Sequence, residues 1–140
     1  MKDSKIARTS TSEKETFELA KGLAESFQGQ EIVFLSGELG AGKTVFAKGI
    51  ASGLGMEDVT QVCSPSFTLV NIYQARYPIF HIDLYRLGKS SEIDDIGWED
   101  YLDRGVIIVE WAEKLEWEGD AIRIDIEVLE DETRRIMIER

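Results

Sequence analysis

The segment Gly37–Thr44 carries the clearest chemistry in the chain. It reads GELGAGKT and matches the spacing G-x-x-x-x-G-K-[ST] at every fixed position. Glycines allow successive backbone N–H groups to point at one oxyanion, and the N-terminus of a following helix adds partial positive charge. Lysine at this spacing reaches the β- and γ-phosphates, and the hydroxyl after it ligates Mg2+. The segment therefore predicts a site for ATP and Mg2+, with Lys43 and Thr44 in these two roles.

The elements expected on either side of this loop support the interpretation. Ile32–Leu35 is a short, continuously apolar run, typical of a strand that is buried on both faces. Thr44–Leu54 predicts a helix that ends at Gly53 or Gly55. A strand before the loop and a helix after it are the context that this motif requires. Within the loop, Glu38 is expected to face solvent, with contact to the nucleotide edge or to a partner as the alternative.

Carboxylates that follow two other predicted strands are candidates for completing a metal site. Such a site needs a carboxylate at the C-terminal end of a neighbouring strand. Val106–Val109 leads into Glu110, and Ile79–Ile82 leads into Asp83. Glu110 is the better metal candidate because its strand resembles the one before the loop. Asp83 stays open between a metal ligand and a base that orients the attacking water, and an ion pair or a helix cap is the structural alternative for both carboxylates.

Four neighbouring features allow a functional and a structural interpretation. His81 shares a strand face with Asp83, so it could position that carboxylate or sense the γ-phosphate, with a satisfied structural histidine as the alternative. Trp111 is either a core aromatic residue or a lid beside the nucleotide. Arg86 could act as an internal arginine finger, although a plain ion pair is favoured. Ser64–Thr68 is a polar loop that could become ordered around a γ-phosphate and Mg2+.

The remaining pattern predicts a single P-loop ATPase domain over residues 1–140. Its fold class is α/β: a three-layer P-loop NTPase-like domain with a partly parallel central sheet and antiparallel hairpins. Besides the elements above, the expected ones are a helix from Thr11 or Ser12 to Gly29, a strand at Phe67–Tyr73 paired in a hairpin with Ile79–Asp83, a helix at Ser91–Leu102 broken near Gly97, and a final hairpin of Ile122–Leu129 with Arg135–Glu139.

Composition narrows the class of protein. One cysteine and one histidine exclude an internal disulfide framework and make a Cys/His zinc site implausible. No apolar run is long enough for a bilayer, and the N-terminus lacks the apolar stretch of a secretory signal, so a cytoplasmic location without membrane association is expected. The net charge of −11 would repel nucleic acid, so no direct, stable nucleic-acid binding is expected. Any role in nucleic-acid chemistry would then pass through a partner, although solubility alone is an equal explanation of the acidity.

Taken together, four segments resemble the TsaE (YjeE) family, the bacterial ATPase of tRNA threonylcarbamoyladenosine biosynthesis. They are, in chain order, GELGAGKT, SPSFTLVNIY, HIDLYRL and VEWAEK. The resemblance extends from the first helix to at least Lys114. It implies slow, Mg2+-dependent hydrolysis of ATP and association with TsaD and TsaB. Those two proteins transfer the threonylcarbamoyl group to adenosine 37 of tRNAs that read ANN codons, and the ATPase resets their complex without touching the tRNA.

The resemblance also assigns roles to individual residues. It implies Lys43, Asp83 and Glu110 as catalytic residues, and Thr44, Asp83 and Glu110 as the metal site. No sharp motif fixes the site of the nucleotide base, which is expected near Thr11 and Arg134. The nucleotide-binding residues implied in this way are Thr11, Gly37, Glu38, Leu39, Gly40, Ala41, Gly42, Lys43, Thr44, Val45, Trp111 and Arg134.

Two other functions share the same loop. A small-molecule kinase would also bind ATP and Mg2+, but it would need a substrate pocket and usually an arginine-rich lid, and the sequence has no arginine cluster. A nucleotide-dependent binding module with negligible turnover is closer to what the resemblance implies. Phosphate release without any acceptor favours an ATPase, stimulation by a metabolite favours a kinase, and ATP-dependent capture of TsaD and TsaB favours the module.

Overall fold

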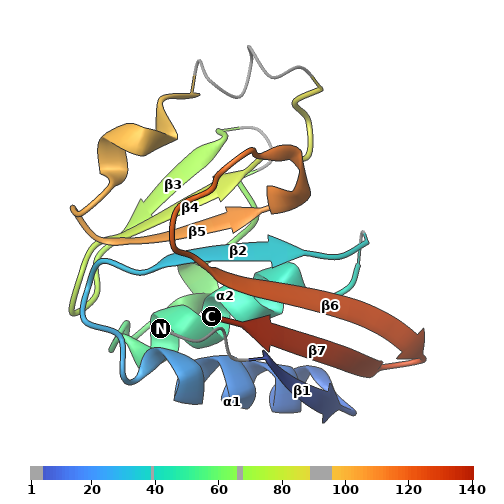
Figure 1. The fold of residues 1–140 in the computed structure, drawn as a ribbon. Coiled ribbons are helices and arrows are strands. Elements are labelled where there is room, and N and C mark those ends of the chain that lie inside the picture. Colours follow the sequence, from blue (N-terminus) through green and yellow to red (C-terminus); the bar gives the residue numbers. More distant parts are fainter. Residues whose placement is uncertain (1–4, 39, 66–67, 89–95) are drawn as a thin grey trace.

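The computed structural model describes residues 5–38, 40–65, 68–88 and 96–140. Seven strands form one sheet in the order β1-β7-β6-β2-β5-β4-β3, and the two α-helices lie on one side of it (Figure 1). The elements are β1 (Lys5–Ser10), α1 (Glu13–Ala24), β2 (Ile32–Ser36), α2 (Lys43–Gly53), η1 (Val59–Gln61), β3 (Val70–Tyr73), β4 (Ile79–Asp83), η2 (Trp98–Tyr101), β5 (Val106–Glu110), η3 (Ala112–Lys114), β6 (Ile122–Glu130) and β7 (Thr133–Glu139).

The middle of the sheet is parallel and its margins are antiparallel, which confirms the predicted fold class. β6, β2, β5 and β4 run parallel, whereas β3 pairs with β4, β7 with β6 and β1 with β7 in antiparallel fashion. In the parallel register Leu35 lies opposite Glu110, and Glu110 lies opposite Asp83. The ends of three neighbouring strands therefore meet at one edge, where open α/β sheets bind their ligands.

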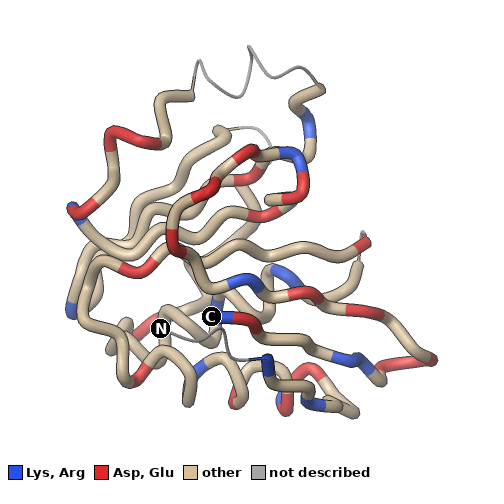
Figure 2. The backbone as a smooth tube through the Cα atoms, viewed as in Figure 1, with Lys and Arg blue, Asp and Glu red and all other residues tan. Residues whose placement is uncertain are grey.

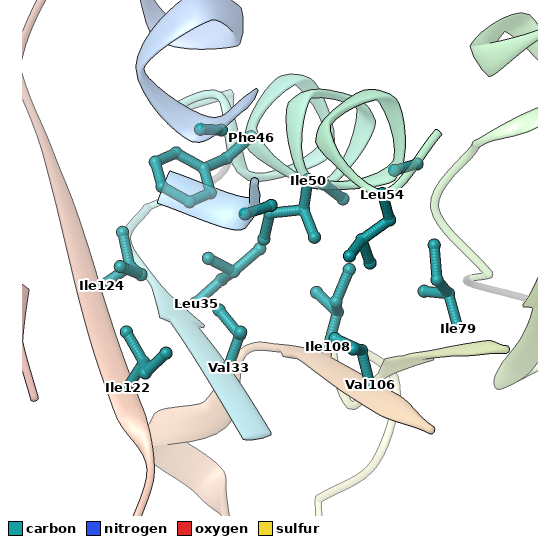
Figure 3. Packing of buried hydrophobic residues seen from close by; sticks show 14 of the residues in the cluster. Val33, Leu35, Phe46, Ile50, Leu54, Ile79, Val106, Ile108, Ile122 and Ile124 are labelled. Carbon is teal, nitrogen blue, oxygen red and sulfur yellow. The ribbon is translucent and has the colours of Figure 1, made fainter. Parts of the chain in front are cut away.

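Each face of the sheet is covered by a separate apolar cluster. On one face, Val33 and Leu35 of β2 pack against Phe46, Ile50 and Leu54 from α2 and its C-terminal end (Figure 3). The alternate residues of β2 point to the other face, where a second cluster includes side chains of the η2 and η3 regions. Burial on both faces explains why β2, β4 and β5 are almost continuously apolar in sequence.

The contact between α1 and α2 depends on glycine. A Cβ added at Gly49 would lie 2.6 Å from Cβ of Ala20 and closer still to the backbone oxygen of Phe17. At Gly22, which is also helical, an added Cβ would meet nothing within 4 Å. Glycine at position 49 therefore permits the close approach of the two helix backbones, whereas glycine at position 22 has no such role.

We expect opposite effects of alanine at these two positions. Gly22→Ala should stabilise the protein by about 0.5–1 kcal/mol, the usual gain in helix propensity. Gly49→Ala should destabilise it by about 1–3 kcal/mol because the helices must separate to admit the methyl group. Urea unfolding of both variants measures the two free energies. A Gly49→Ala protein as stable as Gly22→Ala would show that this helix contact is looser than described.

Four sequence-based element predictions require correction. Strand β1 was not predicted because only Ser10 of its six residues is buried, so the sequence carries no strand alternation. Helix α1 ends at Ala24 rather than Gly29, since the carboxylate of Glu31 draws the amides of residues 28–30 into a turn. Strand β3 begins at Val70 because the preceding residue has a φ of 71°.

The fourth correction concerns the helix predicted at Ser91–Leu102. Residues 89–95 lie outside the described residues, but Trp98–Tyr101 forms a 3-10 helix, preceded by Gly97 with a φ of 67°. That left-handed backbone interrupts an α-helix, which confirms the predicted break near Gly97, whereas the helix after the break is of the 3-10 type and not an α-helix. The other predicted strands and the helix after the glycine-rich loop are confirmed to within about two residues at each end. None of the described helices has the length and apolar character to cross a membrane.

Candidate nucleotide and metal site

The loop between β2 and α2 has the backbone conformation that its glycines predict. Gly37, Gly40 and Gly42 have φ values of 148°, 81° and 111°. Side chains are also excluded at Gly37, where a Cβ would lie 2.6 Å from the backbone oxygen of Ile126. Gly42 caps α2, so the first turn of the helix, with its free N–H groups, begins at Lys43 inside the loop. This arrangement gives the loop the concave, amide-lined form that binds phosphate.

Lys43 lies across this loop rather than in solvent. The residue is only 5% exposed, and its Nζ donates hydrogen bonds to the backbone oxygens of Gly37, at 2.6 Å, and Glu38, at 2.9 Å. The same Nζ lies 4.1 Å from the centre of the Trp111 ring, a cation–π contact. Burial lowers the pKa of Lys43, and the nearby carboxylate of Glu110 acts in the opposite direction. The ammonium group is therefore positioned beside the amides that would bind phosphate.

Four side chains, from α2 and from two adjacent strands, gather next to the loop. The hydroxyl of Thr44 donates to Oε2 of Glu110 over 3.4 Å. Oε2 of Glu110 also lies 2.6 Å from Nε2 of His81, and Asp83 accepts a hydrogen bond from the Ser64 hydroxyl. His81, Asp83 and Glu110 are at most 3% exposed. Two carboxylates from adjacent strands, one histidine and the loop threonine are thus brought together as the sequence predicts.

The chemistry of these donors fits Mg2+ held jointly with phosphate. In the described part of the chain, no three His, Cys, Asp or Glu side chains are grouped closely enough to hold a metal ion among themselves. Mg2+ is commonly bound by one or two carboxylates together with waters and phosphate oxygens. Thr44 and Glu110, already in contact, supply a hydroxyl and a carboxylate of this kind.

Trp111 has an unusual backbone for a bulky residue. Its φ is 62°, in the left-handed region that residues other than glycine seldom adopt. Its ring lies over Lys43 and 5.0 Å from the ring of Tyr85, which is 44% exposed. Backbone conformations of this type persist only where the surroundings stabilise them, and they are common at ligand sites. Trp111 also packs against the second apolar cluster, so it combines a core contact with a position beside the lysine.

The residues expected near the nucleotide base come from the other side of the loop. Nε of Arg134 donates to the backbone oxygen of Ala41 over 3.0 Å, so β7 is attached directly to the loop. Ser10 is the strand partner of Arg134, which places Thr11 close by. The backbone N–H and the hydroxyl of Thr11 both donate to the carboxylate of Glu15, at 2.7 and 2.9 Å. The fold thus brings the N-terminal segment, the C-terminal hairpin and the loop together.

For three of the residues predicted to bind nucleotide, the structure shows little or no contact that bears on this role. Glu38 is exposed, in agreement with the solvent-facing interpretation, although its backbone oxygen accepts a hydrogen bond from Nζ of Lys43. Val45 is half-buried in the first turn of α2. Leu39 lies outside the described residues, as do positions 66 and 67 of the predicted Ser64–Thr68 loop.

Two contacts of the site were not predicted from the sequence. The hydroxyl of Tyr73 lies 2.9 Å from Nδ1 of His81, and Nζ of Lys114 donates to the backbone oxygens of Tyr85 and Leu87, at 2.8 Å each. Both residues end segments that carry the family resemblance, SPSFTLVNIY and VEWAEK, but the sequence assigns a chemical role to neither. Tyr73 shares a sheet face with His81 only in the observed hairpin register, in which Asn71 lies opposite His81, so the sequence alone does not identify it.

A hollow of about 820 Å³ lies elsewhere, at the start of β2 and β6. Glu31, Trp117, Glu118, Asp120 and Arg123 are among the residues that line it. It lacks the glycine-rich loop and the helix N-terminus that bind phosphate. It is therefore not our candidate for the nucleotide site.

Comparison with known proteins decides the family. The family model described as "Threonylcarbamoyl adenosine biosynthesis protein TsaE" matches residues 10–137, nearly the whole chain. The chain belongs to the TsaE family. The matched range includes every element that forms the candidate site, so the site described above is the corresponding region of a TsaE-family protein.

Curated TsaE proteins from several bacteria are similar over most of the chain. The Aquifex aeolicus protein is 38% identical over 130 residues, which cover 92% of each chain. The Rickettsia conorii protein is 40% identical over 90% of this chain and 73% of its own length. Each is named "tRNA threonylcarbamoyladenosine biosynthesis protein TsaE". The crystal structure of Bacillus subtilis YdiB superposes with a TM-score of 0.81 at 29% identity, covering 99% of this chain and 87% of that one.

Proposed function

We propose that this chain is the ATP-binding and ATP-hydrolysing subunit required for threonylcarbamoylation of adenosine 37 in tRNAs that read ANN codons. In this proposal it acts with TsaD and TsaB and is not itself the transferase. Membership of the TsaE family supports the pathway. The observation that carries the enzymatic part is the position of Lys43 inside the glycine-rich loop, next to two buried strand-end carboxylates.

Binding of ATP follows from the loop and its helix. The amides at the start of α2 and the ammonium of Lys43 complement the negative charge of the phosphates. For this, Lys43 exchanges its hydrogen bonds with the Gly37 and Glu38 oxygens for bonds to phosphate oxygens. The ring of Trp111 shields the lysine from water on one side, which strengthens its electrostatic interaction.

Hydrolysis requires a metal and a positioned water. Mg2+, when bound by Thr44 and Glu110, would neutralise charge that develops on the phosphate oxygens. His81 fixes the orientation of the Glu110 carboxylate by its hydrogen bond, and Ser64 does the same for Asp83. The carboxylate of Asp83 would orient the attacking water or contribute to holding the metal, and both roles use the same buried position.

Acidity supports a role without direct tRNA contact. The chain carries a net charge of −11, and Figure 2 shows its lysines and arginines scattered among many acidic residues. Affinity for tRNA depends on neutralising phosphates with basic side chains, which this distribution does not favour. TsaD and TsaB would then bind the tRNA, while this subunit supplies the nucleotide-dependent step.

The test is phosphate release by the purified chain with Mg-ATP and no phosphate acceptor. We expect slow release that is abolished by chelating the divalent metal, and ATP-dependent capture of TsaD and TsaB. Strong stimulation by a metabolite, with transfer of phosphate to it, would contradict the proposal in favour of a kinase. Capture of the two proteins with no phosphate release at all would contradict its enzymatic part.

A further inference from the structure

A line of polar contacts, part-buried at Cys63 and buried at His81, joins the loop after η1 to the carboxylate of Glu110. Tyr73, the last residue of β3, lies in its middle. Its hydroxyl is 2.9 Å from Nδ1 of His81, 3.1 Å from the backbone oxygen of Cys63 and 3.3 Å from the backbone nitrogen of Cys63. On the other side of the imidazole, Nε2 of His81 is 2.6 Å from Oε2 of Glu110.

The register of the β3–β4 hairpin explains why these groups meet. Asn71 lies opposite His81, and Tyr73 lies opposite Ile79. Tyr73 is therefore the diagonal neighbour of His81 on the same face of the sheet, a separation that an aromatic side chain can span. Their ring centres are 5.8 Å apart. Tyr73 is 7% exposed and His81 is fully buried, so water does not replace these contacts.

The number of available protons determines which group donates and which accepts in each of these hydrogen bonds. The Tyr73 hydroxyl has one proton but two possible acceptors, Nδ1 of His81 and the oxygen of Cys63. If the proton goes to Cys63, Nδ1 must carry the histidine proton. Nε2 of a neutral imidazole would then present a lone pair to the carboxylate of Glu110 only 2.6 Å away, two acceptors face to face.

The alternative arrangement satisfies every group. Nδ2 of Asn71 lies 3.3 Å from the oxygen of Cys63 and serves as its donor. The N–H of Cys63 donates to the oxygen of Tyr73, the Tyr73 hydroxyl donates to Nδ1 of His81, and Nε2–H of His81 donates to Glu110. All hydrogen bonds then point from the loop toward the carboxylate.

We propose that Tyr73 is a positioning residue that fixes His81 as the Nε2–H tautomer and thereby orients the Glu110 carboxylate toward the metal site. The same hydroxyl holds the peptide of Cys63, whose neighbour Ser64 donates to Asp83. Tyr73 is thus connected to both strand-end carboxylates: to Glu110 through His81, and to Asp83 through Cys63 and its neighbour Ser64. The tautomer is a property of the protein alone, whereas an effect on ATP hydrolysis rests on the proposed function.

Nitrogen-15 NMR tests the tautomer directly, because His81 is the only histidine of the chain. The experiment uses labelled protein from which any affinity tag has been removed, without nucleotide, at a pH above the ordinary pKa of histidine. We expect Nε2 to carry the proton and Nδ1 to show the shift of a hydrogen-bonded, unprotonated nitrogen. A proton on Nδ1 would overturn the proposal, and this measurement does not require any variant to fold.

Tyr73→Phe removes only the hydroxyl, and Tyr77→Phe is its matched control. Tyr77 is half-buried, and its hydroxyl has no hydrogen bond within residues 5–38, 40–65, 68–88 and 96–140. In Tyr73→Phe we expect the Nδ1 resonance to move downfield as it loses its donor, whereas Tyr77→Phe should leave it in place. An unchanged His81 spectrum in Tyr73→Phe would overturn the proposal.

Kinetics measure the consequence for the site. Substitution of groups that orient metal ligands typically lowers metal affinity or activity about 10- to 100-fold. We expect Tyr73→Phe to reduce kcat for Mg-ATP within this range, with metal-free ATP affinity and the kinetics of Tyr77→Phe unchanged. An unchanged kcat beside the expected NMR shift would overturn the positioning role. If the unsubstituted chain releases no phosphate, the proposed function fails, while the tautomer is still decided by NMR.

Discussion

Lys43→Ala will weaken the binding of ATP by about 100-fold or more. A hydrogen bond to a charged group contributes about 1.5–3 kcal/mol, and each 1.4 kcal/mol is a tenfold change in Kd. Lys43 is positioned to reach more than one phosphate oxygen, because its Nζ already makes two hydrogen bonds across the loop. Replacing Lys43 also removes the hydrogen-bond donor to the backbone oxygen of Gly37. Calorimetric titration of ATP, with and without Mg2+, measures the loss.

Lys48→Ala is the matched control for this prediction. Lys48 lies further along the same helix, is half-buried, and makes no hydrogen bond, ion pair or ring contact with the loop among residues 5–38, 40–65, 68–88 and 96–140. Its loss changes the net charge by the same amount but should alter ATP affinity by less than about twofold, because solvent and salt screen a charge that makes no hydrogen bond to the loop. Equal weakening in the two variants would mean that general charge, not the loop, determines affinity. Unchanged affinity in Lys43→Ala would contradict the loop assignment.

The loop was predictable because all of its chemistry is local in sequence. Three glycines, one lysine and one threonine within Gly37–Thr44 specify the backbone bend, the ammonium and the hydroxyl together. The two strand-end carboxylates were predictable for a related reason. A short apolar run followed by an acid places that acid at the edge of a parallel sheet, whichever strands are neighbours. The register of Glu110 with Asp83 confirms this expectation.

Contacts made across the sequence could not be predicted in the same way. Arg134 reaches the oxygen of Ala41, and Tyr73 reaches the nitrogen of Cys63, only because of the strand order and the hairpin register. The spacing of residues along the chain indicates neither of these contacts. The edge strand β1 is likewise specified by backbone pairing with β7 and not by burial of its own side chains. The sequence therefore indicates which groups are present at the site, whereas the pairing of strands determines what holds them.

Glu110→Gln will lower Mg2+-dependent hydrolysis by about 100-fold or more while leaving metal-free nucleotide binding nearly unchanged. A metal ion supplies several kcal/mol of transition-state stabilisation, and each 1.36 kcal/mol is a tenfold change in rate. Glutamine keeps the shape of Glu110 and an oxygen that can accept from His81, but it removes the charge that attracts the metal. Glutamine is preferable to alanine here, because alanine would leave a cavity and an unpaired imidazole.

Glu116→Gln provides the control, since it removes the same charge at an exposed position six residues away. Phosphate release as a function of Mg2+ concentration, together with ATP titration in the presence of a chelator, separates the two effects. If Glu110 holds the metal, its variant should need far more Mg2+ for the same rate, and Glu116→Gln should behave as the unsubstituted chain. Equal losses of hydrolysis and of metal-free binding in Glu110→Gln would indicate a folding defect, which urea unfolding would reveal. A normal Mg2+ dependence in a folded Glu110→Gln protein would instead exclude Glu110 as a ligand and leave Asp83 as the strand-end carboxylate that holds the metal.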